Sequence, residues 1–368
     1  MKTKCTIAIV VLTAVLINAC NKEPETLADE VVADSGAVRF VLNDLPYQKL
    51  SDYRFYVGNL KDMQPNARVL PYEPINALFS DYAHKSRFIW MPQGVSATYQ
   101  GDHEVLHFPD GTVMIKNFYY DHVLPGGNRR ILETRLIYKK DGHWEFANYK
   151  WNEEQTEAYF DLEGSYMPLS WVDDNGIEKS VNFRIPSEAE CFTCHKSNMQ
   201  NTPIGPKPNN LNKWMAYDEG AMNQLEKWNQ VGYLTGSLPA DIETTVDWTD
   251  ESQPIDMRFR SYIDVNCSHC HSEYGHCYYR PIRFPFWQTT DENNLGVCIE
   301  PQEIINPDIN PNLTHIIARG NPERSVLHFR MNTTDVQYRM PLMGRTLVHT
   351  EAIEMVEAYI NSLTPACN

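Results

Sequence analysis

The chain has 368 residues, of which 48 are acidic and 32 are basic, so its formal net charge is −16. A chain this acidic is repelled by a phosphate backbone, which excludes nucleic-acid binding as an expected function. The sequence also has no phosphate-binding loop, no dinucleotide fingerprint and no hydrolase nucleophile elbow, so those enzyme classes have no support.

The first residues are typical of a bacterial export signal. Lys2 and Lys4 precede an apolar run over residues 7–17, and Cys20 follows shortly after it. The run is too short to span a membrane. It resembles the lipobox of bacterial lipoproteins, which implies a signal peptide over residues 1–19 and lipidation of Cys20. An ordinary signal peptide with a chance cysteine is the alternative.

A lipidated Cys20 would tether the protein to a membrane without spanning it. Residues 20–37 are acidic and have no aromatic side chains, so we expect a flexible tether there. These features predict an exported lipoprotein of a bacterial cell envelope, anchored in the periplasm, at the outer membrane or on the cell surface.

Residues 38–186 are predicted to form an all-β, sandwich-like domain. Residues 111–120, 130–138 and 144–151 are rich in β-branched and aromatic side chains. Turn signals such as Asp141-Gly142 separate these runs. Several short strands with regular turns are typical of a β-sandwich.

Two copies of the pattern C-x-x-C-H follow this region, and their residues are Cys191, Cys194 and His195, and Cys267, Cys270 and His271. The pattern is the attachment signature of a c-type haem. Two thiols one helical turn apart form thioethers with the haem, and the next histidine ligates the iron. The sequence therefore predicts two covalently attached haem c groups.

A zinc site built from two C-x-x-C knuckles is the main alternative. Zinc ribbons separate their knuckles by about 15–20 residues, whereas Cys191 and Cys267 lie roughly seventy residues apart. Zinc also does not explain a histidine directly after both pairs. A redox dithiol is disfavoured because no βαβ pattern surrounds either pair.

The haem units are predicted over residues 187–250 and 251–368, each mainly α-helical and cytochrome c-like. Ser187 is expected to cap a short helix that carries the first motif. A helix over residues 256–267 is expected to lead into the second motif, and Thr350 to cap a last helix. The predicted fold class is therefore α+β and multidomain.

The segment Arg339-Met340-Pro341 lies between these two helices of the second unit. The order helix, C-x-x-C-H, loop, Met-Pro and helix resembles a class I cytochrome c domain. Proline stiffens the loop, and a methionine opposite the proximal histidine is a common sixth ligand. We predict Met340 as the distal ligand of the second haem, with Met343 as the fallback.

The sixth ligand of the first haem is left open by the sequence. Met199, Met215, Met91 and His84 are the candidates, and an open position is a further alternative. An open iron can carry out chemistry, whereas an iron with six ligands mostly passes electrons.

Three cysteines remain after these assignments. In an oxidising compartment Cys277 and Cys298 could form a disulfide that leaves Cys367 over, but the sequence does not decide the pairing.

With these motifs in place, the chain resembles a family of exported bacterial dihaem c-type cytochromes of poorly defined role. The segments that carry the resemblance are 78–83 (LFSDYA), 88–92 (FIWMP), 131–136 (ILETRL), 149–155 (YKWNEEQ), 203–206 (PIGP), 210–212 (NLN), 266–271 (NCSHCH), 340–345 (MPLMGR) and 348–349 (VH). The resemblance implies two covalent haems and electron transfer, and it supplies no substrate. Met343 departs from the family pattern, which has another residue type there.

Three classes of function follow. The first is a membrane-tethered electron carrier between redox proteins, for which basic partners would complement the acidic chain. The second is a haem enzyme with an open first haem, either a dihaem peroxidase or a dehydrogenase subunit, with His84, His103, His107 and His122 as acid-base candidates. The third is a binding module in which the β domain docks a partner.

Overall fold

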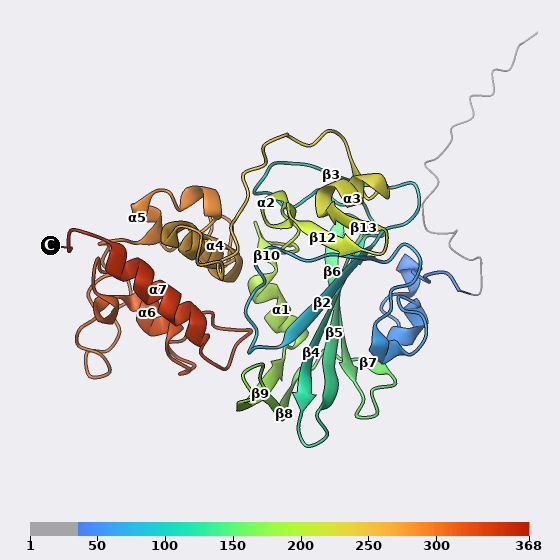
Figure 1. The fold of residues 1–368 in the computed structure, drawn as a ribbon, viewed down its shortest axis with the longest axis horizontal. Coiled ribbons are helices and arrows are strands. Elements are labelled where there is room, and N and C mark those ends of the chain that lie inside the picture. Colours follow the sequence, from blue (N-terminus) through green and yellow to red (C-terminus); the bar gives the residue numbers. More distant parts are fainter. Residues whose placement is uncertain (1–35, 368) are drawn as a thin grey trace, which may run out of the picture.

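The structure is a computed structural model that describes residues 36–367. One region is built on a large twisted sheet, and helices α4–α7 gather beside it as a second region (Figure 1). The predicted signal peptide, most of the tether and the lipidated Cys20 lie outside the described residues. Between residues 36 and 367, no helix is both long and apolar enough to cross a bilayer.

Nine strands precede the first motif: β1 Leu70–Pro71, β2 His84–Trp90, β3 Ala97–Thr98, β4 Val113–Val123, β5 Asn128–Lys140, β6 His143–Trp151, β7 Ala158–Phe160, β8 Ser165–Val172 and β9 Glu178–Ile185. Five more strands follow in the described residues: β10 Lys196–Ser197, β11 Gln200–Asn201, β12 Trp214–Tyr217, β13 Gly220–Asn223 and β14 Leu234–Thr235. β4, β5 and β6 occupy the three runs in which the sequence predicted strands.

The α-helices are α1 Glu188–Cys194, α2 Pro208–Leu211, α3 Gln224–Gln230, α4 Ile255–Cys267, α5 Glu292–Leu295, α6 Val326–Met331 and α7 Thr350–Ser362. Short 3-10 helices cover Leu42–Asp44, Leu50–Tyr53, Leu60–Asp62, Phe286–Gln288 and Pro322–Arg324. α1, α4 and α7 begin within a residue or two of the predicted starts.

The predicted fold class is wrong in two respects. First, all strands of the β region except β3 form one antiparallel sheet in the order β1-β2-β4-β5-β6-β7, in which β8 pairs with both β4 and β9, whereas β3 pairs with β14. The register of β4 shifts after Tyr120, so that Val123 pairs with Trp171 of β8. This irregularity bends the long strand and draws the β8–β9 hairpin into the same sheet, where the sequence predicted a second one.

Second, the haem units are not mainly α-helical. Only α1, α3, α4 and α7 reach seven residues in the described part of the chain. The first unit contains the hairpins β10–β11 and β12–β13. The strands of these hairpins have two residues in β10 and β11 and four in β12 and β13, which is too short to give a clear periodic signal in the sequence. In the second unit, Asn- and Pro-rich turns such as 306–311 interrupt helix formation between α4 and α7.

The two faces of the sheet bury different parts of the chain. One face packs against the N-terminal segment in a cluster that includes Phe40, Tyr53 and Ile115. The other face is apolar at both ends, where Met114 shares a cluster with Trp228 of α3 and Phe118 shares one with residues of β8 and β9. α1 and the first motif contact the middle of this second face, because Phe146 of β6 lies against Phe192 and His195.

The second region has a core of its own. α4 and α7 cross with the rings of Phe259 and Tyr359 stacked 3.9 Å apart. A disulfide joins Cys298 to Cys367, with 5.4 Å between the Cα atoms. The predicted pairing of Cys277 with Cys298 is therefore wrong, and Cys277 is a buried free thiol. The chain folds back through α7 and brings Cys367 to Cys298, which spacing along the sequence could not reveal.

Polar contacts join the two regions. The buried carboxylate of Asp81, in the loop before β2, accepts hydrogen bonds from the backbone N–H groups of Thr346 and Leu347 at 2.7 and 2.8 Å. The side chain of Asn266 in α4 accepts one from the N–H of Phe79 at 2.9 Å. The loop that precedes β2 therefore connects the sheet region to α4 and to the segment before α7.

Candidate functional site

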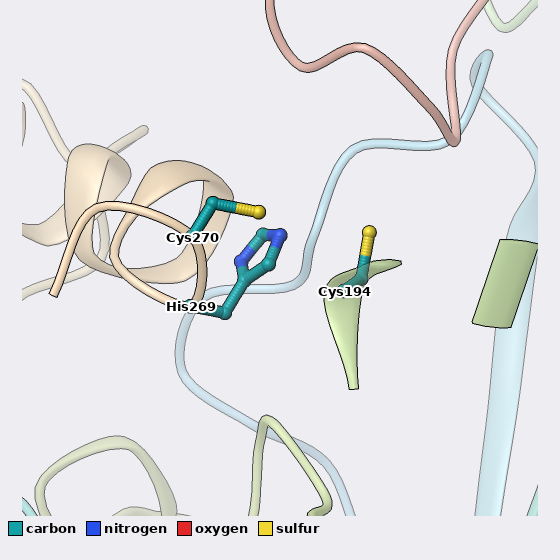
Figure 2. A group of neighbouring side chains, drawn as sticks. All are labelled: Cys194, His269 and Cys270. Carbon is teal, nitrogen blue, oxygen red and sulfur yellow. The ribbon is translucent and has the colours of Figure 1, made fainter. Parts of the chain in front are cut away.

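The two C-x-x-C-H motifs meet in space. Ligand atoms of Cys194, His269 and Cys270 all lie within 4.8 Å of one another. Figure 2 shows the imidazole of His269 between the two thiols. Cys194 is the last residue of α1, whereas Cys270 lies in the turn that follows the end of α4. The backbone N–H of Asn198 also donates to the carbonyl of Tyr274 at 3.0 Å, so the segments that follow the two motifs are joined as well.

The two thiols at this junction differ in acidity. The close approach of the two sulfurs holds the pKa of the Cys194 thiol well below its usual range and raises that of Cys270, whose thiol lies 4.0 Å from the carbonyl oxygen of Thr193. The outer cysteine of each motif is shielded from water instead, and burial raises the pKa of Cys191 to about 11 and of Cys267 to about 12. Among the four motif cysteines, Cys194 is the one whose pKa is shifted toward the more reactive thiolate form.

The first motif is held by a short capped helix. Ser187 and Glu190 form a capping box at the start of α1, which satisfies the free N–H groups there. The motif histidine, His195, lies against the ring of Phe146 and has its Nδ1 3.1 Å from the carbonyl of Thr202. A carbonyl only accepts, so Nδ1 carries the proton and Nε2 keeps its lone pair for a metal.

The second motif begins at the last residue of α4. Its histidine, His271, lies against Phe284, with 5.3 Å between ring centroids. The Nδ1 atom of His271 is buried and has no hydrogen-bond partner among the described residues. Burial lowers the pKa of both His195 and His271 to about 4, so both imidazoles are neutral at pH 7, which is the form that ligates metals.

A cavity of about 340 Å³ opens beside the second motif. The motif residues Cys267, Cys270 and His271 line it together with Met340 and Met343. Apolar side chains of the second core complete the wall, and they include Ile282, Phe284, Ile316, Leu327, Met331 and Ile353. Both methionines predicted as distal ligands therefore share one cavity with the predicted proximal histidine.

A buried arginine holds the methionine loop in place. The guanidinium of Arg345 donates to the carbonyl of Met340 from Nε at 3.1 Å and from Nη2 at 2.9 Å. It also donates to the carbonyls of Arg330, Thr333 and Leu347. One side chain thus ties Met340 to α6 and to the segment before α7. Arg345 lies in the segment 340–345 that carries the family resemblance, but no pattern in the sequence predicted this role.

The described residues fit a covalently attached haem at the second motif. A neutral histidine with an orphaned ring nitrogen, two thiols and two methionines surround an apolar cavity. At the first motif, the thiols and a histidine with a fixed tautomer also fit. Cys194, His269 and Cys270 could instead hold a soft metal ion such as zinc, but thioethers at the same sulfurs would exclude it.

The four candidates for the sixth ligand of the first haem lie in different surroundings. Met199 is 79% exposed at the turn of the β10–β11 hairpin, and Met215 lies on β12. Met91 is fully buried in the cluster with Trp228, and His84 stacks on Tyr119. None of the four is paired with His195 in the contacts of residues 36–367.

Comparison with known protein families, curated proteins and solved structures found no match to this chain.

Proposed function

We propose that this protein is a dihaem c-type cytochrome that relays electrons between redox partners in a bacterial cell envelope. Cys191, Cys194 and His195 would hold one haem, and Cys267, Cys270 and His271 would hold the other. Each haem would supply one-electron chemistry when bound. The residues of the chain would hold each haem in place and control its access to water.

The contact between Cys194 and Cys270 carries this proposal. If each sulfur becomes a thioether, the two haems attach at neighbouring atoms, so their edges lie close together. Electron transfer needs a short gap between donor and acceptor, and two separate metal or dithiol sites would gain nothing from such a junction. Neutral histidines after both cysteine pairs support haem over zinc, because zinc at this junction would leave His195 and His271 unused.

Residues of the second unit support a closed iron there. Met340 would ligate opposite His271, and the carbonyl bonds of Arg345 would keep the methionine loop in position. His/Met ligation raises the reduction potential of a haem, so the second haem would be the electron acceptor of the pair. The apolar wall of the cavity would exclude water, which also favours the less charged reduced state.

The location and partners of the protein belong to the same proposal. Lipidation at Cys20 would hold it at a membrane, and its charge of −16 would favour basic redox proteins as partners.

The first experiment is intact-mass analysis of the purified, matured protein, followed by optical and EPR spectra with and without cyanide. We expect the added mass of two haems and two low-spin irons that do not respond to cyanide. One high-spin iron that binds cyanide would favour an enzyme with an open first haem. A protein without haem mass that retains a metal ion would contradict the proposal in favour of a site at Cys194, His269 and Cys270.

A further inference from the structure

Three basic side chains stand directly opposite one another across the middle of the large sheet. Arg87 of β2 pairs with Lys116 of β4, and Lys116 pairs with Arg135 of β5. Directly opposed residues of antiparallel strands project from the same face, and like charges in these positions repel. We call these three residues the cationic row.

The cationic row has less negative charge around it than positive charge. The fully buried carboxylate of Glu133 accepts two hydrogen bonds from Arg135, at 3.0 and 2.5 Å. A fourth cation, Lys85, lies nearby. Its ammonium, the ammonium of Lys116 and the guanidinium of Arg135 all contact the ring of Phe118. Four cations thus face one directly bonded carboxylate. Burial lowers the pKa values of Lys116 and Arg87, as expected for cations without close counter-charges.

A buried amide without partners extends the cationic row. Asn148 of β6 pairs with Arg135 across the sheet, and it is 4% exposed. Neither its Nδ2 nor its Oδ1 atom has a hydrogen-bond partner among residues 36–367. Burying an amide without hydrogen-bond partners is unfavourable, so a polar ligand at this position would supply the missing hydrogen bonds.

The cationic row lies beneath the first haem motif. Phe146, two residues before Asn148 on β6, contacts the rings of Phe192 and His195. The charge of Arg135 acts on the thiols of Cys191 and Cys194, and that of Lys116 acts on the imidazole of His195. Whatever is attached at the first motif therefore faces ammonium, guanidinium and amide donors together.

We propose that the cationic row and Asn148 form a binding site for carboxylate groups. Charged N–H donors form short, strong hydrogen bonds to carboxylate oxygens, and an amide N–H adds a neutral one. Two sources share this chemistry: the propionates of a haem attached at the first motif, and a free dicarboxylic acid. The first source rests on the proposed function, whereas the second does not.

The test compares three variants with the wild type. Lys116→Gln removes a charge that has no hydrogen-bonded partner in the described contacts, so no buried carboxylate is left alone. Lys116→Arg retains the charge. Lys140→Gln removes an equal charge at the far end of β5, where Lys140 pairs with His143 in the hairpin. Haem number is measured by intact mass, and both midpoint potentials are measured by optical redox titration at low salt and in 1 M salt.

If the row binds haem propionates, all variants carry two haems and Lys116→Gln lowers one potential by about 59 mV, equivalent to a tenfold change in the one-electron equilibrium. The affected haem should be the one attached at Cys191 and Cys194. The shift should persist in 1 M salt, because salt screens buried pairs much less than exposed charges. Lys116→Arg and Lys140→Gln should leave both potentials near those of the wild type.

Succinate, titrated by calorimetry into the purified protein, tests the second source. Saturable binding that Lys116→Gln abolishes and Lys116→Arg retains would identify a free dicarboxylate as the ligand. The succinate titration does not require haem, so it tests the carboxylate site even if intact mass shows no attached haem. A protein without haem would contradict the proposed cytochrome function but not the carboxylate site. Unchanged potentials together with no succinate binding would overturn the carboxylate site.

Discussion

The two C-x-x-C-H motifs have the same five-residue pattern but depend on different parts of the molecule. The second motif is surrounded by its own helical core, with α4, α7 and the Met340 loop around one cavity. The first motif lies on the seven-residue helix α1. It packs against a face of the sheet, where Phe146, more than forty residues earlier in the sequence, contacts His195. Identical local chemistry can therefore be supported by a local unit in one case and by distant strands in the other.

The largest expected effect comes from removing one cysteine pair at a time. Cys191→Ala with Cys194→Ala should remove the mass of one haem and leave the second unit able to bind its own, because the apolar core around α4 and α7 does not include the first motif. Intact-mass analysis and haem staining give the count.

The matched variant is Cys267→Ala with Cys270→Ala, which should also retain one haem. If either double variant loses both haems, the two haems are not attached independently. That result would contradict the view that the second motif depends on its own core and the first motif on the distant strands of the sheet.

The next effect concerns the second site alone. Met340→Ala should abolish the absorbance that arises from charge transfer between methionine and iron, and should lower one midpoint potential, because methionine ligation raises it. Near-infrared absorbance and redox titration measure both. Met343→Ala is the matched control because Met343 lines the same cavity. If Met343→Ala has these effects and Met340→Ala does not, Met343 is the ligand.

The disulfide should stabilise only the second region. It closes a loop with a sequence separation of 69 residues, so Cys298→Ser with Cys367→Ser should lower the free energy of unfolding of this region by about 2–4 kcal/mol. Urea unfolding followed by fluorescence measures the change. Cys277→Ser is the control because Cys277 is buried and free. Equal loss in both variants would assign the effect to core packing instead of the cross-link.

The smallest effect tests the connection between the regions. Asp81→Ala removes a buried carboxylate that accepts from two N–H groups and from the hydroxyl of Thr346. We expect a loss of about 1–3 kcal/mol, because these donors are left buried without partners. Hydrogen exchange should show faster exchange at the amides of Thr346 and Leu347.

Asp62→Ala, on the exposed surface, should leave those amides unchanged. Unaltered protection in Asp81→Ala would mean that the second region holds the methionine loop without help from the sheet.

The sequence predicted those helix starts and long strands that depend mainly on residues close together in the chain. The N-cap Ser187 follows from capping signals, and the long strands β4, β5 and β6 follow from runs of β-formers. The last helix was also predicted, although Thr350 is its first residue and His349 takes the capping position predicted for Thr350. The bend in β4 did not follow, because it depends on which distant strand pairs with Val123. The short hairpins after His195 also lacked a periodic signal long enough to detect.

By itself, the sequence determined the two motifs, their thiols and histidines, and the methionine segment, because each of these is a fixed spacing of reactive side chains. Only the tertiary structure decided that Cys194 meets Cys270, that Cys298 pairs with Cys367, and that Arg345 holds the Met340 carbonyl. The same is true of the cationic row, whose three members lie on three different strands. Each of these contacts joins residues that are distant along the chain or in separate elements, and the packing of whole elements sets those distances.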